Sequence, residues 1–179
     1  MQVEFRNGIQ VLREHEAKPR LTTGILELDS LLAGGVELGT FSLFYGDNEG
    51  FIDRILYNLL CNCQLPQERY GFDGKAILLN CGNYRQEQTL LDLELATSLL
   101  KVNGLDPVRG RDQIIAVSAI NIDQASQAVE EACNILSNDD QVRLLVARNL
   151  AKLFIEDRVR SKETLARIQQ LQHLVGRLW

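Results

Sequence analysis

The feature that most constrains this chain is the alternation of short apolar segments with longer segments of helical spacing. Apolar runs of strand length occupy residues 40–45, 75–80, 113–119 and 142–147. Helical patterns occupy residues 51–63, 86–101, 123–136 and 162–178. Strands that alternate with helices are joined by crossovers, which make the strands parallel and cover both faces of the sheet. The sequence predicts an α/β fold with a parallel sheet flanked by helices.

Length and composition favour one domain. The 179 residues are 45% hydrophobic, enough to bury a core, and no linker interrupts them. No run approaches the roughly 18 apolar residues of a membrane span, and the N-terminus does not have the layout of a signal peptide. We therefore expect no membrane contact and an intracellular location, in the cytoplasm, the nucleoid or the nucleus. The four cysteines have no CxxC spacing, which predicts buried thiols and no metal site.

Charge is distributed unevenly along the chain. Residues 1–140 carry 11 Lys/Arg against 21 Asp/Glu, whereas residues 141–179 carry 8 against 3. An acidic body with a basic C-terminal part suggests a local contact with an anionic partner such as DNA. A solvated basic helix face would give the same pattern.

Residues 46–53 follow the first apolar run in the way that a phosphate-binding loop follows its strand. Such a loop reads GxxxxGK[ST], so that backbone N–H groups and the lysine bind phosphates and the hydroxyl binds Mg²⁺. Here Gly46 keeps the first position, but Phe51 replaces the second glycine, Ile52 the lysine and Asp53 the hydroxyl residue.

Three carboxylates, Asp47, Glu49 and Asp53, lie in or beside this loop. Two like charges about 4 Å apart repel by about 1 kcal/mol in water and by more near a protein surface. Triphosphate binding in the usual pose is therefore not expected. An alternative is that Glu49 and Asp53 hold a metal ion.

The ordered set of motifs resembles the ATPase core of RadA and related RecA-type recombinases. The matching segments are residues 21–24, 28–29, 31–39, 63–66, 74–76, 84–87 and 104–107. The resemblance implies a RecA-like P-loop NTPase core over residues 21–179, preceded by an N-terminal linker over residues 1–20.

Two further departures from the family pattern concern catalysis. Arg148 stands where the Walker B aspartate should follow its strand, and residues 80–83, beside which the catalytic glutamate would fall, contain no acid. Phosphoryl transfer depends on positioned charges. The sequence thus predicts no enzyme but a pseudo-ATPase lacking the Walker A lysine, the Walker B aspartate and the catalytic glutamate, with no cofactor. Arg148 is interpreted as a surface or interface charge.

The resemblance also predicts a C-terminally truncated core. In the family, a further strand lies between the phosphate-loop strand and the Walker B strand. Either these two strands pair directly here, or a partner or a different path of the chain fills the gap.

Two more segments match functional positions of the family. Phe5, with Gly8 three residues later, occupies the place of the FxxA polymerisation motif, although glycine replaces the alanine. A phenylalanine near a terminus can equally pack on its own domain. Arg158, Arg160 and Lys162 lie in the place of the first DNA-binding loop, where they could contact phosphates without reading sequence.

The leading hypothesis is a non-catalytic recombinase paralogue, an accessory or regulatory subunit in DNA recombination and repair. Its partner would be a recombinase or a paralogue, as a homo- or hetero-oligomer, with non-specific DNA contact. The alternatives are a nucleotide-sensing subunit that completes a shared ATP site with a neighbour, and a structural subunit of another complex.

Overall fold

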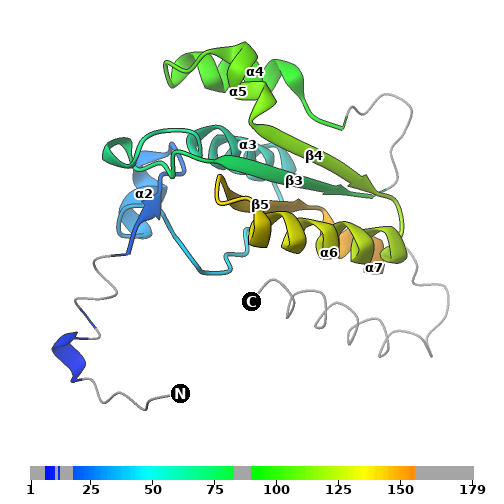
Figure 1. Ribbon diagram of the computed structural model, residues 1–179, viewed down its shortest axis with the longest axis horizontal. Coiled ribbons are helices and arrows are strands. Elements are labelled where there is room, and N and C mark those ends of the chain that lie inside the picture. Colours follow the sequence, from blue (N-terminus) through cyan, green and yellow to red (C-terminus); the bar gives the residue numbers. More distant parts are fainter. Residues whose placement is uncertain (1–6, 11, 13–17, 83–89, 156–179) are drawn as a thin grey trace.

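The computed structural model of the chain describes residues 7–10, 12, 18–82 and 90–155 (Figure 1). Within them, the chain alternates between strands and helices, as the sequence predicts. The elements are β1 (Arg20–Leu21), α2 (Leu26–Leu31), β2 (Val36–Glu37), α3 (Glu49–Asn62), the 3-10 helix η1 (Gln67–Arg69), β3 (Lys75–Cys81), α4 (Leu93–Val102), α5 (Pro107–Asp112), β4 (Ile114–Ala119), α6 (Ile122–Asn138), β5 (Val142–Arg148) and α7 (Leu150–Ile155).

The main sheet has the strand order β4-β3-β5, and β3 pairs with both neighbours in parallel. Leu78 of β3 lies opposite Ala116 of β4 and Val146 of β5. The expected parallel sheet with flanking helices is confirmed, and its central strand is the most buried of the three.

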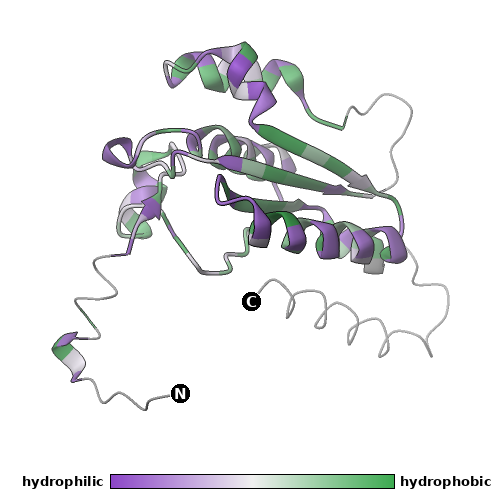
Figure 2. Cartoon of the chain, viewed as in Figure 1, coloured by the Kyte–Doolittle hydropathy of each residue, from purple (hydrophilic) through white to green (hydrophobic). Residues whose placement is uncertain are grey.

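Alternate residues of the sheet face two separate layers of helices. Ala76 and Leu78 of β3 pack in the cluster formed with α3 and α4, while Ile77 and Leu79 belong to the clusters formed with α6 and α7. Figures 1 and 2 show α3 behind the sheet and α6 in front of it, with hydrophobic residues along the strands between them. Because successive strand residues point to opposite faces, each apolar strand supports both layers.

The predicted strand over residues 40–45 is wrong. The structure assigns no strand there, and among the described residues β5 has β3 as its only strand partner. The phosphate-loop segment and the Walker B strand therefore do not pair directly. A strand needs a partner for its backbone groups, and among the described residues this apolar segment pairs with neither edge of the three-stranded sheet.

The helix predicted over residues 86–101 begins later than expected. Asp92 precedes α4 and its side chain accepts a hydrogen bond from the Leu95 N–H at 2.9 Å, which is the contact of an N-cap. Residues 90–92 are not helical, and residues 83–89 lie outside the described part. The helix predicted over residues 162–178 also lies outside it.

The β1–β2 hairpin and the short helix α5 were not predicted. β1 and β2 pair antiparallel around α2, and Asp29 of α2 accepts hydrogen bonds from both Thr22 and Thr23. α5 starts with a proline after the capping residue Asp106. Among the described residues, no helix is both long and apolar enough to cross a membrane.

The hairpin depends on a glycine. Gly35 has φ +122°, and a Cβ there would lie 2.1 Å from the carbonyl oxygen of Leu21. Gly35→Ala should therefore force β2 away from β1 and lower the free energy of unfolding, measured in urea. Gly104 is the matched control, since it has φ +71° but nothing within 4 Å of a Cβ. Gly104→Ala should cost only the roughly 1–2 kcal/mol of the left-handed backbone, and an equal loss in both variants would contradict the clash.

Candidate functional site

The candidate site lies where the carboxyl ends of β3 and β5 meet the first turns of α3. Asn80 of β3 and Arg148 of β5 are register partners, so their side chains leave neighbouring strands at the same level. Asp53 stands in the second turn of α3. Ligand sites of open α/β sheets form at the carboxyl ends of the strands, which makes this the place to look for function.

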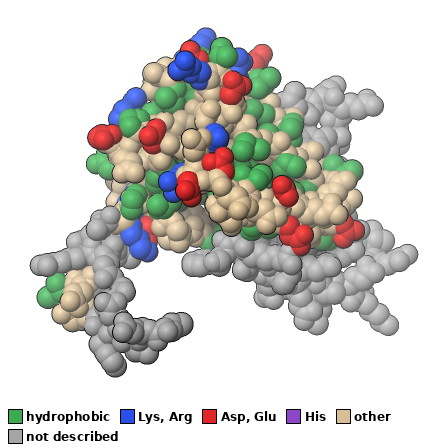
Figure 3. Space-filling model, viewed as in Figure 1, with side chains coloured by type: hydrophobic (Ala, Val, Ile, Leu, Met, Phe, Trp, Pro, Cys, Tyr) green, Lys and Arg blue, Asp and Glu red, His purple; other side chains and the backbone are tan. Residues whose placement is uncertain are grey.

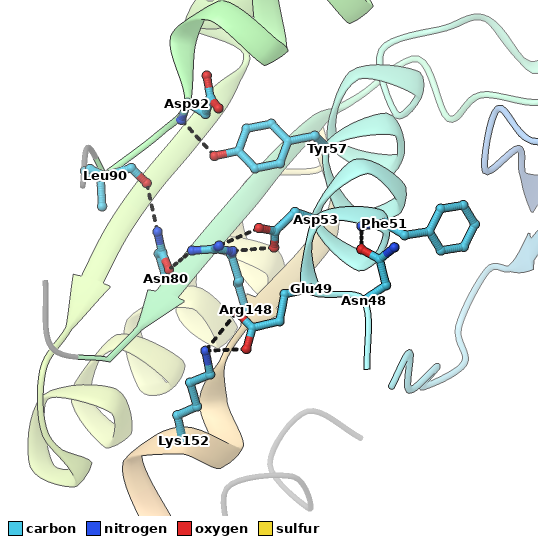
Figure 4. A network of polar contacts seen from close by, with 10 residues as sticks. All are labelled: Asn48, Glu49, Phe51, Asp53, Tyr57, Asn80, Leu90, Asp92, Arg148 and Lys152. Carbon is cyan, nitrogen blue, oxygen red and sulfur yellow. Dashed lines mark hydrogen bonds and ion pairs between the residues drawn. The ribbon is translucent and has the colours of Figure 1, made fainter. Parts of the chain in front are cut away.

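The centre of the site is a bidentate ion pair between Arg148 and Asp53 (Figure 4). The guanidinium donates from Nε to Oδ1 at 2.6 Å and from Nη2 to Oδ2 at 2.5 Å. The two side chains are 20% and 25% exposed. The fork of a guanidinium matches the two oxygens of a carboxylate, so this geometry is stronger and more specific than a single contact.

Hydrogen bonds extend this pair across the sheet toward α4. Arg148 Nη1 donates to Asn80 Oδ1 at 3.3 Å, and Asn80 Nδ2 donates to the carbonyl oxygen of Leu90 at 3.2 Å (Figure 4). The Asp92 N–H donates to the Tyr57 hydroxyl at 2.7 Å. Burial is the main cause that raises the pKa of Tyr57, so this hydroxyl stays protonated.

A second ion pair joins α3 to α7. Lys152 Nζ donates to the two carboxylate oxygens of Glu49 at 3.1 and 3.2 Å, and both side chains are exposed. Asn48 begins α3, because its Oδ1 accepts the Phe51 N–H at 3.0 Å. The N-terminus of α3 is thus capped by its own chain and held beside α7.

These contacts change two sequence expectations. Arg148, interpreted from the sequence as a surface or interface charge, is partly buried and binds Asp53. The three carboxylates are also not left to repel one another, because Asp53 and Glu49 each face a cation. Asp47 remains exposed in the loop. An anion that needed the Arg148 guanidinium would have to displace the carboxylate of Asp53.

The other predicted residues are dispersed. Gly46 and Phe51 are exposed and Ile52 is partly buried, with its Cδ1 3.9 Å from a Cβ placed on Gly46. Gly8 is exposed, with nothing within 4 Å of a Cβ. The remaining four residues lie outside the described part of the chain: Phe5, Arg158, Arg160 and Lys162.

Sequence reasoning missed four contributors to the site, namely Tyr57, Asn80, Asp92 and Lys152. The spacing of Arg148 and Lys152, four residues apart across the end of β5, was a usable signal for two cations near the same helix terminus. The contacts of Tyr57 and Asn80 join segments far apart in the sequence, and no pattern in the sequence indicates them.

None of the four cysteines forms a disulfide, and three are buried as predicted. Burial raises the pKa of Cys61, Cys63 and Cys81 to about 12 each, and Cys133 is partly buried. Among the described residues, no group of His, Cys, Asp or Glu could hold a metal ion. Glu49 and Asp53 instead bind Lys152 and Arg148.

Comparison with known families assigns the chain. A family model described as Rad51 matches residues 15–179. The chain belongs to the Rad51 family. A DNA repair and recombination protein RadA of Metallosphaera sedula is 30% identical over 171 residues, which are 95% of this chain and 50% of that protein. The Rad51-family chain thus spans about half the length of the curated relative that it matches, and the resemblance to RadA-type recombinases is confirmed.

Membership of the Rad51 family corrects the expectation that the chain is not an enzyme. That expectation rested on individual motif positions, whereas the family model matches residues 15–179. The RadA relative is also similar over 95% of the chain. The resemblance that led to this family was to ATPases. Differences at Ile52, Asp53 and Arg148 do not remove the chain from it.

The contribution of the Arg148–Asp53 pair can be measured by substitution. Arg148→Met leaves a partly buried carboxylate without its guanidinium and should lower the free energy of unfolding by roughly 1–2 kcal/mol. Adding Asp53→Leu should recover part of that loss, because no charge is then left unpaired.

Lys152→Met is the matched control for Arg148→Met. It breaks an exposed ion pair at the same helix and should change stability by no more than about 1 kcal/mol. All variants are compared by urea unfolding. Equal losses for Arg148→Met and Lys152→Met, or no recovery in the double variant, would contradict a special role for the Arg148–Asp53 pair.

Proposed function

We propose that this chain acts in DNA recombination and repair as an accessory or regulatory subunit. It binds a recombinase or another paralogue and modulates its assembly on DNA. As a protein that acts on DNA it works inside the cell, in the cytoplasm and nucleoid or in the nucleus. Membership of the Rad51 family and the RadA relative support this role.

The Arg148–Asp53 pair is the observation that carries the proposal. It joins the end of β5 to the start of α3 with charges that belong to the chain itself. The elements that flank the phosphate-loop position are therefore held together by a contact within the protein. A subunit organised in this way is suited to act through its surfaces, by binding and orienting another subunit.

The direct test is binding to a Rad51-family recombinase from the same organism. The purified chain and recombinase are mixed with and without ATP, and complex formation is followed by size-exclusion chromatography and isothermal titration. The proposal expects a stoichiometric complex and a changed rate of recombinase assembly on single-stranded DNA. A complex that forms only with ATP would favour the shared nucleotide site instead. Absence of any complex under both conditions would reject the accessory role.

Phe5 is the proposed anchor of this complex. Phe5→Ala should weaken recombinase binding by about 2 kcal/mol or more if the ring fills a pocket of the partner, because truncation empties that pocket. Affinity and melting temperature are measured on the same variant. Tyr70→Ala is the control, since Tyr70 is an exposed aromatic residue elsewhere on the chain. A lowered melting temperature with unchanged affinity would mean that Phe5 packs on its own domain.

DNA binding is expected to be weak, independent of sequence and sensitive to salt. It is carried by Arg158, Arg160 and Lys162, so changing all three to Glu should abolish it, measured by fluorescence anisotropy with single-stranded DNA. With single-stranded DNA, each lost phosphate contact should reduce the slope of log affinity against log salt by about 0.7.

The matched control makes the same charge change elsewhere, by replacing the exposed residues Arg69, Lys101 and Arg109 with Glu. That variant should keep its DNA affinity. If both triple variants lose binding equally, net charge and not the loop is responsible. Binding that survives the loop variant would place the DNA contact on another surface.

A further inference from the structure

A hollow in the surface between α4 and α5 lies apart from the candidate site. Figure 3 shows Lys and Arg side chains, with acidic and hydrophobic ones among them, at the top of the molecule, where Figure 1 places these two helices. The hollow has a volume of about 410 Å³ and is lined by Leu93, Glu94, Thr97, Ser98 and Arg111. The first four residues share one face of α4, and the arginine comes from α5.

Close packing of α5 on α4 brings Arg111 to this face. Gly110 is buried, and a Cβ there would lie 2.5 Å from Leu100 Cδ2, so no side chain fits at this position unless Leu100 moves. Gln64 Nε2 donates a hydrogen bond to the carbonyl oxygen of Gly110 at 2.8 Å and holds the end of α5 in place. The next residue, Arg111, reaches α4, where its Nη1 donates to Thr97 Oγ1 at 3.4 Å. The guanidinium therefore lies at the hollow.

Arg111 differs from the other partly buried arginines of the described chain in its partners. Three arginines of the described residues are partly buried, namely Arg20, Arg111 and Arg148. Arg20 pairs with Glu37 and Arg148 with Asp53, whereas no carboxylate of the described residues forms an ion pair with Arg111. Its hydrogen bond to a hydroxyl, at 3.4 Å, is long for a charged donor. A guanidinium that is partly removed from water gains most when a carboxylate binds its fork.

The rest of the lining fits a single carboxylate side chain. The hydroxyls of Thr97 and Ser98 can donate hydrogen bonds to its oxygens. Leu93, which is 52% exposed, offers an apolar surface to the methylene groups that carry the carboxylate. Glu94 lines the same hollow and repels a second negative charge there. A phosphate group with two charges, or the row of charges along a DNA strand, is therefore disfavoured relative to one carboxylate.

We infer that the hollow between α4 and α5 binds an Asp or Glu side chain of the recombinase subunit with which this chain associates. The inference rests on the proposed accessory function and deepens it by naming a contact surface. Arg111 holds the carboxylate with its guanidinium fork, and the hydroxyls of Thr97 and Ser98 complete its hydrogen bonds. Glu94 makes the hollow selective, because it opposes a cluster of negative charges more than a single one. The contact is distinct from the proposed Phe5 anchor, since here the partner supplies the side chain.

Substitutions in the hollow test this contact through recombinase affinity, measured by isothermal titration. Arg111→Met keeps an unbranched side chain but removes the fork, and it should weaken binding about tenfold, as expected for the loss of a hydrogen bond to a charged group. Arg111→Lys keeps the charge without the fork and should recover only part of the loss. Glu94→Gln should strengthen binding, because it removes the repulsion. The matched control is Arg109→Met, which makes the same charge change on an exposed residue of α5 outside the lining and should leave the affinity unchanged.

Circular dichroism and urea unfolding check that each variant is folded. A recombinase affinity that Arg111→Met leaves unchanged would overturn the inference, as would an equal loss in Arg109→Met, which would make net charge responsible. Weaker binding by Glu94→Gln would assign a cationic partner group to the hollow and overturn it as well. Loss of DNA affinity in Arg111→Met, measured by fluorescence anisotropy, would assign the hollow to phosphate instead.

The wild-type chain separates this inference from the proposed function. If it forms no complex with the recombinase, with or without ATP, the accessory role is rejected and the carboxylate contact with it. If it forms a complex that is insensitive to Arg111→Met, the accessory role stands and only the contact in the hollow is overturned.

Discussion

The bidentate contact between Arg148 and Asp53 sets the relation between the sheet and the helix that begins at Glu49. Arg148 is the last residue of β5, and its guanidinium reaches Asp53 while a third nitrogen reaches Asn80 on the neighbouring strand. A partly buried ion pair adds little net stability when compared with apolar residues of the same size. Its main physical effect here is orientation, because a planar fork accepts a carboxylate in few geometries.

The rest of the site follows from this orientation. Asn80 is held between Arg148 and the carbonyl oxygen of Leu90, and Tyr57 binds the backbone just before α4. The Asp92 end of the segment that follows β3 is bonded directly to α3, whereas Asn80 at the other end is linked to α3 through Arg148 and Asp53.

Most of the fold could be predicted from the sequence, because local periodicity reports burial. β3, β4, β5, α3 and α6 appear within one or two residues of their predicted bounds. The strand predicted over residues 40–45 is wrong because strand formation depends on a neighbouring strand, which the sequence pattern does not reveal. The predicted start of α4 is too early because Asp92 caps the helix and so ends the helical pattern that precedes it. Asp53 and Arg148 both lie in the candidate site, but they are 95 residues apart in the sequence, so no local pattern predicts that they form an ion pair.

The arrangement of the thiols has a practical consequence for labelling. Three cysteines lie in the two core layers with their thiolate forms strongly disfavoured, and the thiolate is the species that attacks an electrophile. Cys133, on α6, is the partly buried exception. A maleimide dye added near neutral pH to the native protein will therefore attach first to α6. The natural sequence thus carries its own attachment point for a fluorophore, on the helix layer opposite α3.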